Sequence, residues 1–358
     1  MLGGAPADPS LLAQLTLLDI EENADLSGAI QLHLPIHRSG ADDLTHLNAA
    51  GLQPYANISV VATPEGGGDQ CLFDGYVLAH RVHVDTGVTA SHLQVWGQDA
   101  TCLMNLEEKT KEWSDMSEGD VANAIFNTYG IQPASENAAD NPPTHPESGH
   151  TLMQRGSDIQ FLRRLARRSG RLCRIACADR PGQRTGYFAK PKLDGDTAVT
   201  LSPNDPDRPN VEAMNFAWDV MRPTSVVARQ TVFDQTDADG VQGDSQDAGL
   251  TLLQQRGLAD FAGRAMTTRL TAPVDDAGEL TQRAQAVLRD AGWFVRCEGE
   301  TDLARLNVIL RVGTVVQVAH VGSLLSGKYY VWSVRHTLTP EHHKMRFTLV
   351  RNAVGPAQ

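Results

Sequence analysis

Apolar and polar residues alternate along two stretches of the chain, residues 27–110 and residues 293–350. In the first stretch, Ile30, Leu32 and Leu34 alternate with polar neighbours, which is the period of a half-buried strand. Further strand-like runs follow there, with a triple-glycine turn between two of them, at residues 57–62, 72–84 and 92–96. Both stretches therefore predict antiparallel β structure.

Between these stretches the apolar period changes to that of a helix. Ser117 with Asp120, and Ser157 with Gln160, form two potential capping boxes that would each open a helix. An apolar stripe follows each box, made of Val121, Ile125, Phe126 and Tyr129 in the first helix and of Phe161, Leu162, Leu165 and Ala166 in the second. Glycines stand where each helix would end, at Gly130 and Gly170. Two strands at 172–176 and 185–189, joined by a turn at 180–182, complete this region.

The segment from residue 201 to residue 292 is harder to assign. Residues 202–210 are rich in proline and predict a linker, and residues 234–249 are acidic and glycine-rich, which predicts a loop. Helical periodicity returns at 252–268 and at 280–291, with Gly292 as the expected cap of the second helix. A proline-containing loop is also expected at 133–150.

The two β stretches contain a weak internal echo. In both, a Val-rich strand precedes a glycine-led turn, a tyrosine-bearing strand and a histidine; these are Gly75, Tyr76 and His80 in one copy and Gly327, Tyr329 and His336 in the other. The echo predicts two copies of one small antiparallel barrel or sandwich, each closed on itself so that no strand edge is exposed. Alternatively, any two hairpins with glycine turns look alike.

We therefore predict an α+β fold that is mainly β, with two pseudo-equivalent small antiparallel β-barrels and an inserted helical α/β region. The expected boundaries are 1–110 for the first barrel, 111–200 for the insertion, 201–272 for a linker and acidic segment of open placement, and 273–358 for the second barrel. Three such chains in a closed ring would present six near-equivalent units to a sixfold partner.

Composition and charge narrow the function. The 358-residue chain has a net charge of -12, which disfavours tight nucleic-acid binding because phosphate recognition needs clustered basic residues. The basic cluster, interpreted as a solvated or interface face, consists of Arg163, Arg164, Arg167, Arg168 and Arg171. No apolar run approaches the ~20 residues of a membrane helix, and no basic leader begins the chain. Five scattered cysteines fit free thiols in a reducing compartment.

The sequence has no G-x-S-x-G elbow, no H-E-x-x-H and no P-loop. His33 with His37, and Cys173 with Cys177, could each share a strand face and so hold zinc, but the pairs are far apart in sequence and ordinary surface histidines and buried thiols are the preferred interpretation. An acidic cluster at Glu107, Glu108 and Glu112 and the turn at His342 and His343 fit solvated surface. We expect no catalytic residue, no cofactor and no metal site.

Four stretches of the sequence resemble a known family, the late control gene D proteins of contractile phages together with the hub portion of VgrG proteins. They are 72–77 with 93–99, 106–113 with 120–130, 154–170, and 313–353. The third is the most specific, with Gln154, the Ser157-Asp158 pair, Phe161-Leu162, Leu165-Ala166 and Gly170 in the family's order. Residues 234–272 fit no pattern of the family.

The resemblance implies a structural role without enzymatic activity. It implies a homotrimeric ring that joins a tail tube protein above to a membrane-piercing spike below, beside other baseplate or wedge proteins, with DNA or cargo passing through the lumen. Since the sequence stops at Gln358, just after the second β stretch, the spike is expected to be a separate polypeptide. The expected location is the virion tail baseplate, after assembly in the bacterial cytoplasm. The alternatives are a tail-associated peptidoglycan hydrolase, a DNA- or effector-binding module, or the hub of a type VI or extracellular contractile injection system.

Ten residues are candidates for structural or interface roles. Apolar members such as Trp113 and Phe126 could pack between chains or within their own domain, and both alternatives stay open at this point. The candidates are Gly75, Tyr76, Trp113, Phe126, Asp158, Phe161, Leu162, Gly327, Tyr329 and His336.

Overall fold

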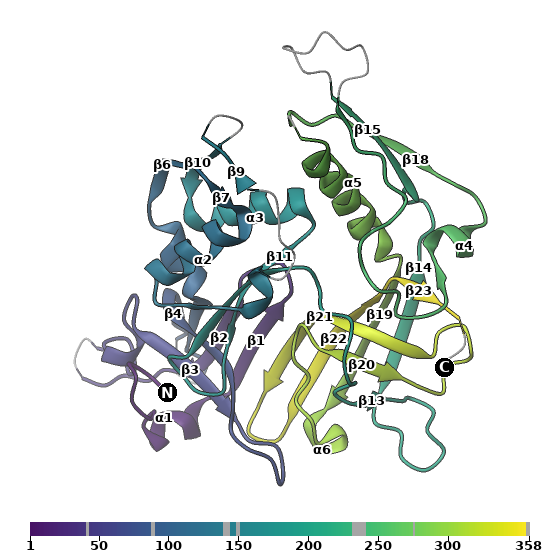
Figure 1. The fold of residues 1–358 in the computed structure, drawn as a ribbon. Helices are drawn as coiled ribbons and strands as arrows, with labels where there is room; N and C mark the ends of the chain where they lie inside the picture. The colour runs from purple at the N-terminus through teal and green to yellow at the C-terminus, as the bar shows by residue number, and fades with distance from the viewer. Residues whose placement is uncertain are drawn as a thin grey trace.

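The computed structural model describes residues 1–358 except 41–42, 87–89, 139–143, 148–150, 231–240, 275 and 356–358. A large sheet forms the base of the molecule, and two helix-containing insertions stand on it (Figure 1). The main path of the sheet is β14-β19-β22-β21-β1-β2-β5-β4-β3. The fold is therefore α+β and mainly β, as predicted.

The sheet consists of two halves that share one topology. The first half contains β1 (Leu17–Asn23), β2 (Ala29–Pro35), β3 (Asn57–Ala62), β4 (Gln70–His83) and β5 (His92–Asp99). The second contains β14 (Ala213–Trp218), β19 (Val295–Asp302), β20 (Val315–Val318), β21 (Gly327–Leu338) and β22 (His343–Arg351). All pairings are antiparallel, in the orders β1-β2-β5-β4-β3 and β14-β19-β22-β21-β20. The chain thus carries two copies of one five-stranded unit.

Local irregularities recur at matching places in the two units. The β4–β5 register shifts between Val77 and Ala79, and the β21–β22 register shifts between Val331 and Ser333. Aligning these bulges equates Val77 with Val331, and the strand pairings then equate whole rows across the sheet. The rows are Val77, Gly97, Ile30 and Ile20 in the first unit and Val331, Leu349, Cys297 and Phe216 in the second. A bulge is a specific structural feature, so its recurrence supports duplication.

The residue that precedes the outer strand also repeats its conformation. Tyr55 and Gly313 both have positive φ, at 61° and 89°. The Tyr55 amide donates to the Val77 carbonyl, and the Gly313 amide donates to the Val331 carbonyl. A left-handed tyrosine is uncommon, so the same turn in both units indicates a shared backbone template.

Some predicted correspondences were wrong. Gly75 lies inside β4 opposite Asp99, not in a turn, and its equivalent is Tyr329 rather than Gly327. His80 is equivalent to Val334, so the two echoed histidines do not match. Tyr76 matches Tyr330. The sequence comparison aligned Gly75 with Gly327. Equivalent backbone positions are instead those at the same distance from the bulge in each unit.

The units are not closed barrels in the described residues. They are instead joined side by side, because β1 pairs with β21. β3 and β14 lie at the two ends of the main path and do not pair with each other. The first strand of the second unit, β14, comes before residue 273, where the sequence placed the start of the second barrel.

The first insertion follows β5 and has its own buried core. Its elements are η2 (Ala100–Asn105), β6 (Glu108–Trp113), β7 (Met116–Ser117), α2 (Glu118–Thr128), β8 (Gln132–Pro133), η3 (Ser135–Ala138), β9 (Thr144–His145), β10 (Leu152–Ser157), α3 (Asp158–Ser169), β11 (Leu172–Cys177) and β12 (Arg184–Ala189). Both predicted helices are confirmed: Ser117 and Asp120 form a reciprocal capping box, and Ser157 caps α3, which ends at left-handed Gly170. Gln160 does not complete the second box, because its side chain points to Asn105.

A second insertion separates β14 from β19. It contains β15 (Ser225–Gln230), β16 (Val241–Gln242), β17 (Arg256–Gly257), α4 (Leu258–Ala262), β18 (Thr267–Leu270) and α5 (Ala277–Gly292). The helix predicted at 280–291 is confirmed as α5, although Trp293 rather than Gly292 caps it. The helix predicted at 252–268 is wrong, because Gly263 turns left-handed and ends α4 after five residues. Of the acidic loop predicted at 234–249, residues 234–240 lie outside the described residues, and the rest begins with β16.

Short elements complete the described chain: α1 (Pro9–Gln14), η1 (Ala50–Leu52), β13 (Thr200–Leu201), α6 (Leu303–Leu306) and β23 (Ala353–Val354). Within the described residues, no helix combines the length and apolarity needed to cross a bilayer.

The close packing of β4 on β5 generates a prediction. A Cβ at Gly75 would lie 2.2 Å from the Gln98 carbonyl oxygen, whereas a Cβ at Gly68 meets no atom within 4 Å. We expect Gly75→Ala to lower the free energy of unfolding by about 1–3 kcal/mol, because the backbones must separate. Gly68→Ala is the matched control and should change it by less than about 0.5 kcal/mol. Equal values in urea unfolding would contradict the close packing.

Candidate assembly interface

The junction between the two units combines an apolar face and a polar face. On the inner face, Ile20 of β1 lies opposite His336 of β21, and both are fully buried at 0% exposure. On the outer face, Asp19 accepts hydrogen bonds from Arg335 Nη2 at 2.7 Å and from Thr337 Oγ1 at 2.6 Å. Burial raises the pKa of Asp19, but these two donors outweigh it and hold the pKa below its usual value. At the junction, β1 of the first unit therefore covers the edge of β21 in the second unit.

The same edge of the first unit is uncovered. Beyond the bulge, residues Leu78–His83 of β4 pair with β5 on one side only, within the part of the chain described. These residues are all exposed, and Val82 and Val84 reach 41% and 62% exposure. Large apolar side chains on a free strand edge are a site for pairing with another chain.

A second free edge belongs to β14, at the opposite end of the sheet (Figure 1). Among the described strands β14 pairs only with β19, whereas its counterpart β1 has partners on both sides. Trp218 is 54% exposed although its ring contacts Phe261 at 5.4 Å between centroids. Met214 and Phe216, the equivalents of buried Leu18 and Ile20, are only half-buried.

The outer strands of the two units are covered within the chain. The N-terminal segment covers β3, since the Gly3 amide donates to the Asn57 carbonyl and the Ser59 amide donates to the Met1 carbonyl. β13 covers β20 by parallel pairing. The uncovered edges in the described part of the main sheet are thus the β4 edge, Leu78–Val84, and the β14 edge, Ala213–Trp218.

The histidine at the junction is held neutral. His336 Nδ1 lies 3.0 Å from His343 Nε2, and burial, followed by His343 and Arg311, places the pKa of His336 well below its usual value. His343 starts β22 and is half-buried, while His342 in the turn is exposed, so the solvated interpretation holds for His342 alone.

Gly327 and Tyr329 form one buried arrangement with Arg351. The Arg351 guanidinium lies 5.0 Å from the centre of the Tyr329 ring, and its Nη1 donates to the carbonyls of Leu325 and Ser326. Burial raises the pKa of Tyr329 to about 12. Gly327 has φ 135°, and a Cβ there would meet Gln254 Nε2 at 2.4 Å. A glycine is required here because Arg351 and Gln254 fill the space beside it.

Asp158 is the centre of a hydrogen-bond network in the first insertion. Its Oδ2 accepts from Lys109 Nζ and from Tyr129 OH, each at 2.7 Å, and its Oδ1 accepts from Gln154 Nε2 at 2.6 Å. Gln154 in turn accepts from Trp113 Nε1 at 3.0 Å. Burial raises the pKa of Asp158, but the three donors outweigh it and lower the pKa. The network joins β6, β10, α2 and α3, which explains why glutamine and Ser-Asp occur together in the motif.

The apolar candidates of the insertion lie in its interior. Trp113, Phe126, Phe161 and Leu162 are all buried in one cluster with Leu165. The structure thus gives these residues packing partners within their own chain. Tyr76, also a candidate, packs against this cluster and stacks on Arg184, whose guanidinium lies 4.9 Å from its ring.

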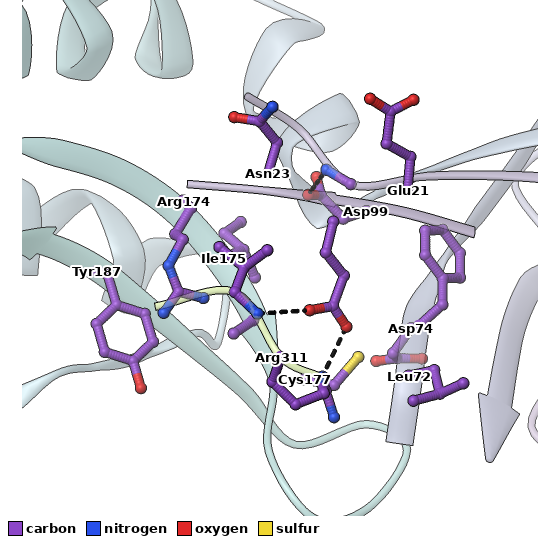
Figure 2. Close-up of a pocket in the computed structure, with 15 residues that line it drawn as sticks. Glu21, Asn23, Leu72, Asp74, Asp99, Arg174, Ile175, Cys177, Tyr187 and Arg311 are labelled. Carbon is purple, nitrogen blue, oxygen red and sulfur yellow. Dashed lines mark hydrogen bonds and ion pairs between the residues drawn. The ribbon is translucent and has the colours of Figure 1, made fainter. Parts of the chain in front are cut away.

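A cavity of about 220 Å³ lies between the first unit, the insertion and the segment before β20 (Figure 2). Two of its acidic side chains are in ion pairs: Glu22 Oε1 lies 2.9 Å from Arg311 Nε, and Asp74 Oδ2 accepts from Arg184 Nε at 2.7 Å. A third, Asp99, accepts hydrogen bonds from the backbone amides of Gly28 and Thr101, and burial raises its pKa. The Cys177 thiol hydrogen-bonds to Cys71, which lowers the pKa of Cys71. The two ion pairs join the first unit to the segment before β20 and to the first insertion.

The remaining candidate chemistry is dispersed. Cys173 is buried apart in the insertion core, and no group of three or more His, Cys, Asp or Glu side chains in the described ranges is placed to hold a metal ion. Glu107, Glu108 and Glu112 are exposed. Of the arginine cluster, Arg163 donates to Ser27, Arg168 pairs with Glu118, and Arg171 donates to the Phe188 carbonyl.

The Asp158 network generates a stability prediction. Asp158→Asn removes the charge that Lys109 and Tyr129 share, and we expect the free energy of unfolding to fall by about 1.5–3 kcal/mol. Asp179→Asn, on an exposed carboxylate of the same insertion, is the matched control and should leave it within about 0.5 kcal/mol. Chemical unfolding followed by tryptophan fluorescence measures both. Equal stability of the two variants would refute the role of Asp158.

His336 generates a pH prediction. The folded protein binds a proton at His336 less readily than the unfolded chain does, so stability is complete above about pH 6.5 and falls as the pH drops below that value. Between pH 7 and pH 5 we expect urea unfolding to show a smaller loss for His336→Val than for the wild type. The valine copies the residue at equivalent position 82. His342→Val, at an exposed position, should keep the wild-type loss; identical losses in all three proteins would contradict the prediction.

Comparisons with known proteins agree with this architecture. The sequence profile described as phage tail baseplate hub (GPD) matches residues 41–341. No curated protein sequence matches the chain. Among solved structures, the 43 kDa tail protein of prophage MuSo2 from Shewanella oneidensis is similar, with a TM-score of 0.65, 16% identity and 95% of each chain covered.

Two further structures extend the likeness. The tail protein from Neisseria meningitidis MC58 has a TM-score of 0.65 at 14% identity, covering 96% of this chain and 95% of that one. The E. coli c3393 protein, described as a component of the type VI secretion system, has a TM-score of 0.58 at 10% identity, covering 96% of this chain and 76% of that one. These identities show a shared fold, and the profile covers most of the chain. The protein belongs to the phage tail baseplate hub (GPD) family.

Proposed function

We propose that this chain is the subunit of a homotrimeric, pseudo-sixfold hub ring that joins a tail tube to a separate membrane-piercing spike. The observation that carries the proposal is the duplication of the five-stranded unit within one chain. Three chains supply six such units, so the ring can dock on a sixfold tube on one side and a threefold spike on the other.

The free strand edges support a ring rather than a monomer. The β4 edge and the β14 edge lie at different ends of the sheet and differ in sequence, so a contact between them is head-to-tail. Head-to-tail contacts between identical chains produce closed rings when the rotation closes. The two helix-containing insertions stand on one side of the sheet (Figure 1), where other baseplate or wedge proteins could be bound.

The charge of the chain supports a passage for DNA or cargo. A net charge of -12 on each subunit disfavours tight binding of a polyanion, so DNA in transit would pass through the ring without being held. We place the protein in the virion tail baseplate, after assembly in the bacterial cytoplasm.

The proposed role is structural and not enzymatic. Two acidic side chains of the Figure 2 cavity are paired with arginines, Glu22 with Arg311 and Asp74 with Arg184. Asp99 accepts hydrogen bonds from the backbone amides of Gly28 and Thr101. A peptidoglycan hydrolase would need two carboxylates free to act as acid and base. Clearing of bacterial cell walls by the purified protein in a zymogram would contradict the structural role.

The proposal predicts a specific mass and a specific partner. Light scattering after size exclusion should give three times 38.8 kDa, either for the chain alone or once the tail tube protein of the same tail is added. Pull-down should recover the tube protein with the trimer and not with an unrelated β-sheet protein of similar charge. A particle that stays monomeric and binds no tube protein under both conditions would refute the proposed function.

A further inference from the structure

The β1–β21 junction gives a template for the contact between neighbouring chains. Since the first unit is equivalent to the second, the β4 edge corresponds to the part of β21 that β1 covers, and β14 corresponds to β1. Within the described chain, β21 has its partner and β4 lacks one, while β14 offers the strand that would fit. The edge of β21 is therefore covered by β1 within the chain, whereas the equivalent edge of β4 has no partner strand among the described residues.

We infer that β14 of one copy of this chain adds as an antiparallel strand to the β4 edge of a second copy, in the register that β1 uses on β21. The inference rests on the proposed trimer and names its contact. Each added strand satisfies backbone groups along both free edges, as in recognition by strand addition.

The register follows from residues already equated. Val331 matches Val77, and Ile20 matches Phe216; Ile20 lies opposite His336, five positions after Val331. The corresponding residue, five positions after Val77, is Val82. Phe216 of one copy therefore lies opposite Val82 of the next. The same step places Trp218 opposite His80, Met214 opposite Val84 and Ala217 opposite Arg81.

The residue types fit the two faces of this pairing. The inner face brings together Met214, Phe216 and Trp218 with His80, Val82 and Val84. All but His80 are apolar, and Trp218, Val82 and Val84 are exposed in the single chain. Inside the chain, the same positions are filled by Leu18 and Ile20 against Val334 and His336, all buried. The pairing would thus bury the apolar side chains that the single chain leaves on its edges.

The outer face repeats a polar contact in weaker form. Asp19 binds Arg335 and Thr337 within the chain. The equivalent residues are Asn215 for Asp19, Arg81 for Arg335 and His83 for Thr337. The arginine is therefore present in both units, but an amide replaces the carboxylate. A neutral acceptor binds arginine less strongly than a carboxylate does, so the contact between chains would be more readily reversible than the contact within one.

Cysteine cross-linking tests the register. Arg81→Cys with Ala217→Cys places two thiols directly opposite, within the Cα separation that a disulfide spans. Arg81→Cys with Ala213→Cys is the matched control, because Ala213 lies on the same strand and face but roughly 13 Å further along. Mild oxidation of the assembled protein should give covalent dimers and trimers for the first pair, and neither for the control pair nor the wild type.

The outcomes separate this inference from the proposed function. A trimer by light scattering that gives no cross-link with the first pair, or cross-links as well with the control pair, overturns the strand register and leaves the trimer standing. A chain that neither trimerises nor cross-links, with or without the tube protein, overturns both.

A charge on the apolar face gives an independent test. Val82→Lys should raise the trimer dissociation constant at least tenfold without changing the unfolding midpoint of the monomer, because Val82 is already exposed there at 41%. Val61→Lys is the control, at a β3 valine that is 38% exposed outside the proposed contact. Equal dissociation constants for the two variants would overturn the inference.

Discussion

The pairing of β1 with β21 is the constraint on which the molecule depends. It joins strands that are more than 300 residues apart in sequence and turns two five-stranded units into one continuous sheet. Ile20 and His336 are fully buried at this junction, whereas their equivalents on the unpaired edges, Phe216 and Val82, are half-buried and exposed. Without this pairing each unit would keep an open edge, and the shared apolar core that runs through both units would be divided.

The insertions depend on this sheet in different ways. The first is stabilised by a polar network around Asp158, in which a buried carboxylate receives one ammonium, one phenol and one amide donor. Removing a donor from such a network leaves a buried charge without compensation, which is costly. The second is organised by the apolar face of α5 on β15, with Leu280, Ala284 and Leu288 in its core. Neither insertion interrupts the order of strands in its unit.

Duplication within one chain also explains why the two units differ in detail. One copy of the junction lies inside the chain and contains the buried His336, which contacts half-buried His343, and an Asp19–Arg335 ion pair. The equivalent surface on the β4 edge carries Val82 and Arg81, which a soluble single chain can expose before assembly. An exposed strand edge that pairs with a second chain needs apolar side chains for that contact and charged side chains that limit unspecific aggregation.

The sequence alone determined the features that depend on neighbours along the chain. Ser117 and Ser157 cap their helices because each side chain reaches a backbone amide three residues away, and Gly170 ends α3 because it adopts a left-handed conformation. Alternation predicted the strands, and the matching order of glycine, tyrosine and strand predicted the duplication. The resemblance to hub proteins came from the same short patterns.

Only the tertiary structure decided which residues are equivalent and which edges are closed. The echo of Gly75 with Gly327 and of His80 with His336 was misplaced, because the two glycines lie at different distances from the equivalent bulges at Leu78 and Trp332. The predicted closed barrels are instead one shared sheet, because β1 pairs with β21 of the other unit. No local sequence pattern identifies a pairing partner so far away along the chain. The helix predicted at 252–268 failed because the strand β17 occupies Arg256–Gly257 and left-handed Gly263 ends α4 after five residues.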